Sequence, residues 1–358
     1  MIRITLREIT WRIAAAGLLS LVALPGLAAT QVPQPGSITQ AEWHTYVSHF
    51  VTEGGRVVDD ANGNISHSES QGYGLLLAYL SKDQATFDQI WSFTETNMWL
   101  RDDGLVAWKW DPATRPHIQD INNASDGDVL IAYSLALAAK KWNRSDLGDA
   151  ALRIATAIAT KLVFKTDEQW IITPAVTGFD SKDAEDGPVI NLSYWIFEAF
   201  PVLAEMTKQG DLNKLTHSGV DLIQEARFGP DMLPSDWISL HDGMKPASGF
   251  PTEFSYNSFR IPLYLMRSGH ESTELLKPFL NAMGSSKDGV QVINVNTGAR
   301  SKPLNDLGYA AIGAALECVL EGKPLPEEIT TFKPTSYYPS TLHLLVLSFI
   351  TEQHPVCR

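Results

Sequence analysis

The chain has 358 residues, of which 44% are apolar, and its 25 glycines and 20 prolines are scattered rather than clustered. Such a chain can bury a large core, which excludes an intrinsically disordered protein. The net charge of -13 disfavours binding to nucleic acid or anionic lipid because like charges repel, so a neutral or cationic partner fits better.

Residues 1–29 have the pattern of a cleaved secretory signal peptide. Three arginines precede an apolar run that ends at Leu24, and Pro25 begins a stretch of small residues that suits a signal peptidase. A permanent membrane anchor is the alternative, but the apolar segment is shorter than the ~20 residues that a spanning helix needs. We therefore expect residues 30–358 to be the secreted mature chain, periplasmic or extracellular, without stable membrane insertion, folded as one large domain or two small ones.

From Ile38 onward the apolar residues recur at helical spacing, and no strand-rich block stands out. Residues 129–139 and 307–316 are apolar nearly all round and should be buried, whereas 85–97 and 150–162 place polar residues on one face. The predicted helices cover residues 40–52, 69–80, 84–97, 126–141, 147–162, 190–207, 211–226, 255–267, 272–284, 304–320 and 338–352, and 324–339 should be a long loop.

This alternation of buried and half-buried helices predicts an all-α fold, a toroid with inner and outer rings. A stacked helical solenoid is the competing interpretation, but the sequence shows no repeat of fixed period. The loops before the buried helices hold most of the polar residues of interest, so we expect helix N-termini to converge on one cleft. Cys318 and Cys357 are the only cysteines, and a single bridge and two free thiols are equally compatible with the sequence.

Glu69 lies in the segment 67–74, at the mouth of an apolar helix. Desolvation there could raise the pKa of its carboxyl and keep it protonated near neutral pH, as a general acid requires. The structural alternative is that Ser66 or Ser68 caps the helix and Glu69 complements its dipole. His67 and Glu69 also form an H-x-E pair, but the chain lacks the P-C-x-x-C partner of a zinc deaminase, so no metal site is predicted.

A second acidic cluster occupies residues 122–128. Ser125 and Asp128 fit a capping box, which gives Asp128 a structural task. Asp126 is freer, and in the first helical turn it would stay ionised and could accept hydrogen bonds from a sugar or a water. Local physics leaves structure and function equally open for Asp126.

Taken together, segments 66–74 and 124–142 resemble the two signature regions of glycoside hydrolase family 8, the first of which carries Glu69 as proton donor. The resemblance extends to residues 107–110, 191–194, 235–237 and 254–260. The order and spacing are most similar to the small single-domain endoglucanases that accompany bacterial cellulose synthases. The resemblance implies that residues 30–358 are one catalytic domain with an (α/α)6 barrel. It also implies cleavage of β-1,4-glucan with inversion, no cofactor, and a functional association with cellulose synthase.

One position departs from the family pattern. Many members carry an Asp as general base where this chain has Asn257, and an amide can orient a water but cannot take its proton. The base must then come from another carboxylate, for which Glu253 is the first candidate because it lies four residues upstream. The other candidates are Asp306, Asp186, Glu185 and a recruited Asp126.

Aromatic residues near the expected cleft are candidates for stacking on sugar faces. Trp108 and Trp110 flank a lysine in an acidic loop, and Tyr194 and Tyr256 lie in the resembling segments. Most buried aromatic residues serve only the core, so sugar contact and packing are both open for these four. Arg260 lies three residues after Asn257 and could fix that amide, a carboxylate or a sugar hydroxyl, or it could be an ordinary buried arginine.

The predicted mechanism has Glu69 protonate the glycosidic oxygen while a water attacks the anomeric carbon from the opposite face. Inverting enzymes separate acid and base by roughly 6.5–9.5 Å to leave room for this water. Asp126 would favour the positive charge that develops on the sugar. The alternatives are a secreted glucan-binding protein that lost catalysis with the change to Asn257, and the same fold acting on chitosan or xylan.

Overall fold

The computed structural model describes residues 32–166, 169–285 and 289–358, so the predicted signal peptide lies outside the described residues. Twelve α-helices occur in this part of the chain. They are α1 (Gln40–Phe50), α2 (Ser68–Leu80), α3 (Gln84–Asn97), α4 (Ser125–Trp142), α5 (Ser145–Lys161), α6 (Ala199–Thr207), α7 (Asp211–Glu225), α8 (Ile261–Arg267), α9 (Thr273–Met283), α10 (Leu307–Glu321), α11 (Glu327–Thr330) and α12 (Tyr337–Gln353).

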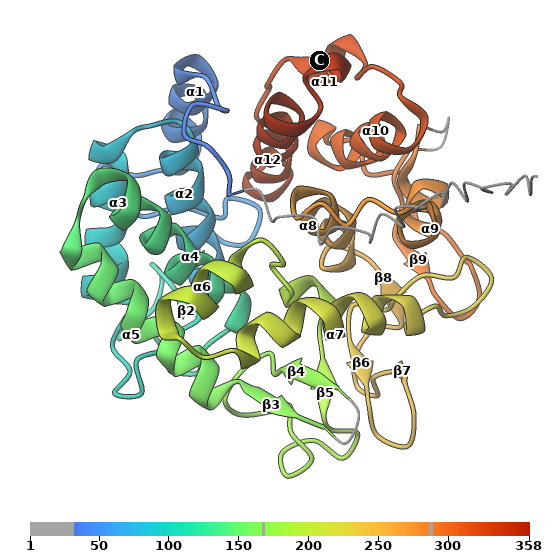
Figure 1. The fold of residues 1–358 in the computed structure, drawn as a ribbon, viewed down its shortest axis with the longest axis horizontal. Coiled ribbons are helices and arrows are strands. Elements are labelled where there is room, and N and C mark those ends of the chain that lie inside the picture. The colour runs from blue at the N-terminus through green and yellow to red at the C-terminus, as the bar shows by residue number, and fades with distance from the viewer. Residues whose placement is uncertain (1–31, 167–168, 286–288) are drawn as a thin grey trace, which may run out of the picture.

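The even-numbered helices form an inner ring and the odd-numbered helices surround it (Figure 1). In the inner ring α2 packs on α4, α4 on α6, α8 on α10 and α10 on α12, and α12 returns to α2. Between α6 and α8 the ring is joined by two short 3-10 helices, η1 (Leu192–Tyr194) and η2 (Ser258–Arg260). The alternation of buried and half-buried helices that the sequence predicts is thereby confirmed as an (α/α)6 barrel.

Burial follows the polarity of each helix. In α4 every side chain from Ser125 to Ala138 is buried, as an apolar helix at the centre of a bundle should be. In α5 the buried residues recur at helical spacing on one face, from Leu147 to Ile158, and the opposite face meets solvent. The inner and outer positions can therefore be read from the width of the apolar face.

Three expected elements differ from the structure. The predicted helix over 255–267 is α-helical only from Ile261, where α8 begins after η2. The predicted helix over 190–207 begins only at Ala199, because the Asn191 side chain accepts hydrogen bonds from the Ser193 N–H at 3.1 Å and from its hydroxyl at 2.7 Å. Such a local turn competes with helical hydrogen bonds. The expected loop over 324–339 contains the short helix α11.

The strands in the described residues are two or three residues long and tie loops together. They are β1 (Ser66–His67), β2 (Lys109–Trp110), β3 (Val163–Lys165), β4 (Trp170–Ile172), β5 (Val189–Ile190), β6 (Ile238–Ser239), β7 (Lys245–Pro246), β8 (Glu253–Phe254) and β9 (Ile293–Asn294). All the pairs are antiparallel: β1 with β2, β3 with β4, β6 with both β5 and β7, and β8 with β9.

Cys318 and Cys357 form a disulfide with 6.1 Å between their Cα atoms. Of the two possibilities that the sequence leaves open, the bridge is therefore confirmed, and it fastens the C-terminal segment to α10. No helix in the described part of the chain has the length and apolar character needed to cross a membrane.

Candidate active site

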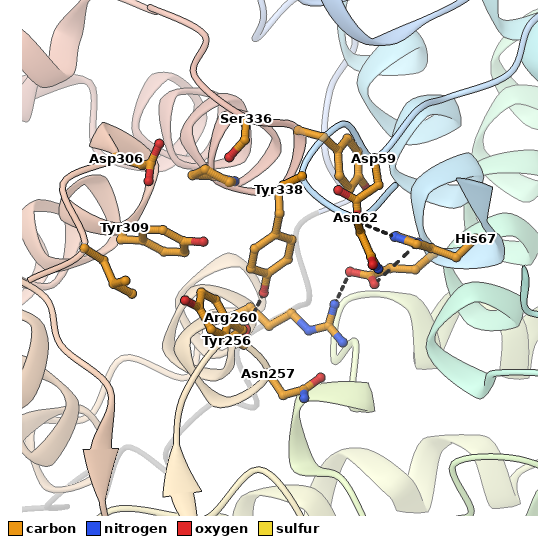
Figure 2. A pocket seen from close by; sticks show the side chains of 15 residues that line it. Asp59, Asn62, His67, Tyr256, Asn257, Arg260, Asp306, Tyr309, Ser336 and Tyr338 are labelled. Atoms are coloured by element: carbon orange, nitrogen blue, oxygen red, sulfur yellow. Dashed lines mark hydrogen bonds and ion pairs between the residues drawn. The ribbon is translucent and has the colours of Figure 1, made fainter. Parts of the chain in front are cut away.

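The N-terminal ends of the inner helices α2, α8, α10 and α12 converge on one cavity of about 540 Å³, in line with the convergence that the sequence predicts (Figure 2). The loop before α2, the starts of α2, α10 and α12, and the segment that enters α8 contribute side chains. The lining residues are Asp59, Ala61, Asn62, His67, Glu69, Tyr256, Asn257, Arg260, Leu304, Asp306, Tyr309, Ser336, Tyr337, Tyr338 and Pro339. The cavity therefore combines carboxylates with tyrosine rings, a lining suited to a neutral polar ligand.

At the centre of the site, Arg260 joins the two carboxylates that the sequence singled out. Its Nη1 donates to Glu69 Oε1, and its Nη2 donates to Asp126 Oδ2 at 2.7 Å and to Ser193 Oγ at 3.2 Å. The Arg260 and Asp126 side chains are only 2% and 3% exposed, whereas that of Glu69 is 19% exposed. Glu69 thus lines the cavity, whereas Asp126 is buried and is not a lining residue.

Glycine residues let α2 and α4 approach each other closely enough for this arrangement. A Cβ atom on Gly127 would lie 2.0 Å from Ser68 Oγ and 2.7 Å from Glu69 N, and one on Gly72 would lie 2.5 Å from Leu130 Cβ. Contacts this short are not tolerated, so both positions need glycine. The Gly that follows Asp126 therefore positions Glu69 as well.

His67 caps α2 and contacts Glu69. Its Nδ1 accepts from the Ser70 N–H at 3.0 Å, so the proton is on Nε2, which donates to Asp59 Oδ2 at 3.3 Å. The predicted cap by Ser66 or Ser68 is therefore wrong. Burial lowers the pKa of His67, but the hydrogen bond to Asp59 and the charge of Glu69, whose Oε2 is 3.7 Å from Nδ1, raise it above its usual value overall.

Burial also perturbs both acids at the start of α4. It raises the pKa of Asp126 to about 6, although Arg260 opposes the shift, and it raises the pKa of Asp128 to about 7. The predicted capping box is wrong, because the N-cap is Ala124 and Ser125 Oγ makes no hydrogen bond. Asp128 instead accepts from the Val106 N–H and the Asn123 amide, each at 2.8 Å, and so has the structural task expected of it.

The predicted sugar-stacking residues lie in different surroundings. Tyr256 lines the cavity and is 48% exposed. The ring of Tyr194 lies 5.6 Å from the Arg260 guanidinium. Trp108 and Trp110 are not among the residues that line this cavity, and the Trp110 ring stacks on His117 with 4.0 Å between centroids. Tyr256 is thus the most accessible of the four to a ligand in the cavity.

Asn257 lines the same cavity as Glu69, but the candidate bases are dispersed. Asp306 lines the cavity and lies beside Tyr309, well away from Arg260 and His67 (Figure 2). Glu253 is half-buried in β8 and is not a lining residue. Asp186 accepts from the Ser248 N–H at 2.7 Å in a separate loop, and Glu185 is also absent from the lining.

The family model "Glycosyl hydrolases family 8" matches residues 10–352. The chain belongs to glycoside hydrolase family 8. A probable endoglucanase of Novacetimonas hansenii is 32% identical over 321 residues, which cover 88% of this chain and 91% of that protein. The family recognised from the two signature segments is thereby confirmed.

Two solved structures of family 8 endoglucanases are similar to this fold. Endoglucanase Cel10 from Klebsiella pneumoniae is 32% identical with a TM-score of 0.78, and the match covers 87% of this chain and 99% of that one. The endo-β-1,4-glucanase CMCax from Acetobacter xylinum is 31% identical with a TM-score of 0.76, and the match covers 87% and 97% of the two chains.

Several residues of this family 8 site are not among those predicted from the sequence. Asp59, Tyr337 and Tyr338 line the cavity, and Ser193 contacts Arg260. The two tyrosines begin the last apolar helix, so the expectation that inner helix N-termini converge could have identified them. Among the residues that the structure describes, no group of three or more His, Cys, Asp or Glu side chains could hold a metal ion.

Proposed function

We propose that this chain is an endo-β-1,4-glucanase that cleaves internal bonds of cellulose-like glucan with inversion. Membership of glycoside hydrolase family 8 and the similarity to endoglucanases over most of both chains support this activity. The observation that carries the proposal is the pair Glu69 and Asp126, held by Arg260 at the wall of a cavity rich in tyrosine.

Glu69 is the proposed general acid and Asp126 the carboxylate that supports it. A general acid must be protonated when substrate binds, whereas an arginine contact favours an ionised carboxylate. Because Asp126 is buried and also paired with Arg260, it can hold the guanidinium when Glu69 takes up a proton. The negative charge of Asp126 then favours the positive charge that develops on the sugar.

Asn257 is proposed to orient the attacking water, and Asp306 to accept its proton. Glu253 was the first candidate, but Asp306 is the one among Glu253, Asp306, Asp186 and Glu185 that lines the cavity with Glu69 and Asn257. It lies on the far side of the cavity from His67, the neighbour of Glu69 (Figure 2). Acid and base on opposite sides are what inverting hydrolysis requires.

The place of action is a second part of the proposal. The arginine-rich and apolar residues 1–29 support secretion into the periplasm or medium. The order and spacing of the sequence motifs support a role beside a cellulose synthase. Fractionation of cells that express the full chain, with activity measured in each fraction, tests the location.

The experiment that tests the activity compares wild type with Glu69→Gln on soluble derivatives of cellulose, chitosan and xylan, with release of reducing ends as the assay. The amide keeps the shape but cannot donate a proton, so hydrolysis should fall at least 100-fold, since general acid catalysis contributes about 10²–10⁴-fold. Glu95→Gln, on the exposed face of α3, is the matched control and should keep full activity.

Each alternative function gives a different result. A glucan-binding protein that lost catalysis, which Asn257 makes a real alternative, would bind cellulose derivatives without releasing reducing ends from any substrate. A preference for chitosan or xylan would appear as faster hydrolysis of that substrate. Glu69→Gln with more than a tenth of wild-type activity would remove Glu69 from its role.

A further inference from the structure

A buried carboxylate next to the cavity, Asp236, gathers the donors of one short segment. Its Oδ1 accepts from the Ser255 N–H at 3.0 Å and from the Ser258 N–H at 2.9 Å. Its Oδ2 accepts from Ser255 Oγ at 2.6 Å and faces Asn257 Nδ2 at 3.5 Å. Asp236 is only 6% exposed, so these four donors are directed at a buried carboxylate.

The contact with Asp236 decides how the Asn257 amide is turned. An ionised carboxylate can only accept hydrogen bonds, so the group of Asn257 that faces it must be the NH₂ group and not the carbonyl oxygen. The reversed amide would set two acceptors against each other. Because Asn257 lines the same cavity as Glu69, its Oδ1 is left as an acceptor for a ligand or a water in that cavity.

We propose that Asp236 is a positioning residue for hydrolysis: it holds Asn257 so that Oδ1 accepts a hydrogen bond from the attacking water. The inference rests on the proposed function. Asp236 takes no proton itself, and the proton of the water goes to the general base. A water fixed by Asn257 has one of its hydrogens directed, which leaves a lone pair for the anomeric carbon and the second hydrogen for the base.

Asp236 also anchors the turn that leads into η2 and Arg260, so loss of activity in Asp236→Asn alone would not separate positioning from folding. The reversed pair does separate them. In Asp236→Asn the two NH₂ groups face each other, whereas Asp236→Asn with Asn257→Asp restores one donor and one acceptor. Asn257→Asp does nothing for the Ser255 and Ser258 N–H groups, so a structural defect would persist.

The experiment is a double-mutant cycle measured as kcat and KM on a soluble cellulose derivative. We expect Asp236→Asn to lower kcat at least tenfold with little change in KM. The factor by which Asn257→Asp changes kcat should then be at least ten times larger in the Asp236→Asn background than in the native background. Equal effects of Asn257→Asp in both backgrounds would overturn the proposal, even if Asn257→Asp itself supplies a new base.

Two controls keep the outcome interpretable. Ser255→Ala removes one donor to Asp236 without touching Asn257, so it should lower thermal stability and keep kcat within threefold. If Asp236→Asn does not fold, Asn257→Asp alone decides the matter. The new carboxylate would lie beside Asp236, so its pKa must be above its ordinary range and the pH profile of kcat should gain a new limb. A profile without this limb would contradict the proposal. A wild type without hydrolysis would instead refute the proposed function itself.

Discussion

The two sides of the active-site cavity are built differently. The side that carries the proposed general acid consists of Glu69, Asp126 and Arg260, which lie at helix N-termini in the inner ring, and it is called the acid side below. The opposite side, proposed to hold the attacking water and called the water side below, consists of Asp236, Asn257 and Asp306. Asp236 lies in a loop, and Asn257 and Asp306 are N-cap residues whose side chains make no capping hydrogen bond. A direct ion-pair network joins the first group, whereas no hydrogen bond between Asp306 and the other two is present in the structure.

This difference indicates which of the proposed catalytic side chains are held in place by contacts with one another. On the acid side Gly127 lets two helices touch, and the carboxylates share one guanidinium, so their positions are coupled. On the water side Asp236 fixes Asn257, but Asp306 is held apart from them. We therefore expect the acid side to respond to backbone changes and the water side to respond to loss of single side chains.

The largest expected effect concerns the proton acceptor. Asp306→Asn should lower kcat at least 100-fold, because a general base contributes about 10²–10⁴-fold. It should leave the fold intact, since the Asp306 side chain makes no capping bond to α10. Glu253→Gln is the matched variant and should cost less than threefold. The opposite ranking of the two variants would return the base to Glu253, and azide rescue of the slower variant would identify it independently.

The second prediction tests the charge on the acid side. Asp126→Asn should lower kcat about 100-fold and change KM little, because a charge that stabilises the transition state acts mainly on turnover. Since burial raises the pKa of Asp126 to about 6, kcat of the wild type should fall as the pH drops through that value and the carboxylate takes a proton. Asp126→Asn should lack this limb, and a mutant profile with the limb unchanged would assign it to another group.

The acid side and the water side also differ in how far their residues could be predicted from the sequence. Glu69 and Asp126 could be singled out because segments 66–74 and 124–142 together resemble the two signature regions of the family, whereas the local pattern alone left a structural role open for each. Arg260 was identified as a candidate, but its bond to both acids joins segments 134 and 191 residues apart, a pairing that no local pattern contains.

The water side was harder to predict, and the reason is physical. The spacing of four residues between Glu253 and Asn257 suggested that both face the cavity. Glu253 instead pairs in β8 with Asn294 of β9, and among the four candidate bases Glu253, Asp306, Asp186 and Glu185 the one that lines the cavity is Asp306, at the N-cap of α10. Loops without regular periodicity do not reveal which way a side chain points. The capping pattern at Ser125 was misleading because Asp128 accepts hydrogen bonds from the Val106 N–H and the Asn123 amide, both outside the helix, instead of taking part in a cap.

The third prediction probes the backbone of the acid side. In Gly127→Ala the new methyl group would collide with Ser68 Oγ at 2.0 Å and press on the amide of Glu69, so α2 must shift. Small displacements of catalytic groups cost about 10–100-fold in rate, and we expect about tenfold in kcat. Gly148→Ala in α5 is the control, because its Cβ would only touch Ala139 Cβ at 3.6 Å. Equal kcat in both variants would show that the close approach is not needed for catalysis.

The smallest effect on turnover is expected for Asp128→Asn, which separates support of the fold from chemistry. The two carboxylate oxygens face the Val106 N–H and the Asn123 NH₂ group, and Asn123 cannot turn because its Oδ1 accepts from the Val176 N–H at 2.8 Å. With an amide at position 128, its NH₂ group must therefore face a buried donor, either the Val106 N–H or the Asn123 NH₂ group. The free energy of unfolding should fall by about 1–3 kcal/mol.

In the same variant kcat per folded molecule should stay within twofold of wild type, because Asp128 bonds neither Glu69 nor Arg260. Denaturant unfolding and initial rates on one preparation measure both quantities. Asp149→Asn, on the exposed face of α5, should change neither, since surface substitutions away from such contacts stay within about 0.5 kcal/mol. If Asp128→Asn lost activity at unchanged stability while Asp126→Asn lost stability at unchanged kcat, the structural and catalytic roles of the two neighbouring acids would have to be exchanged.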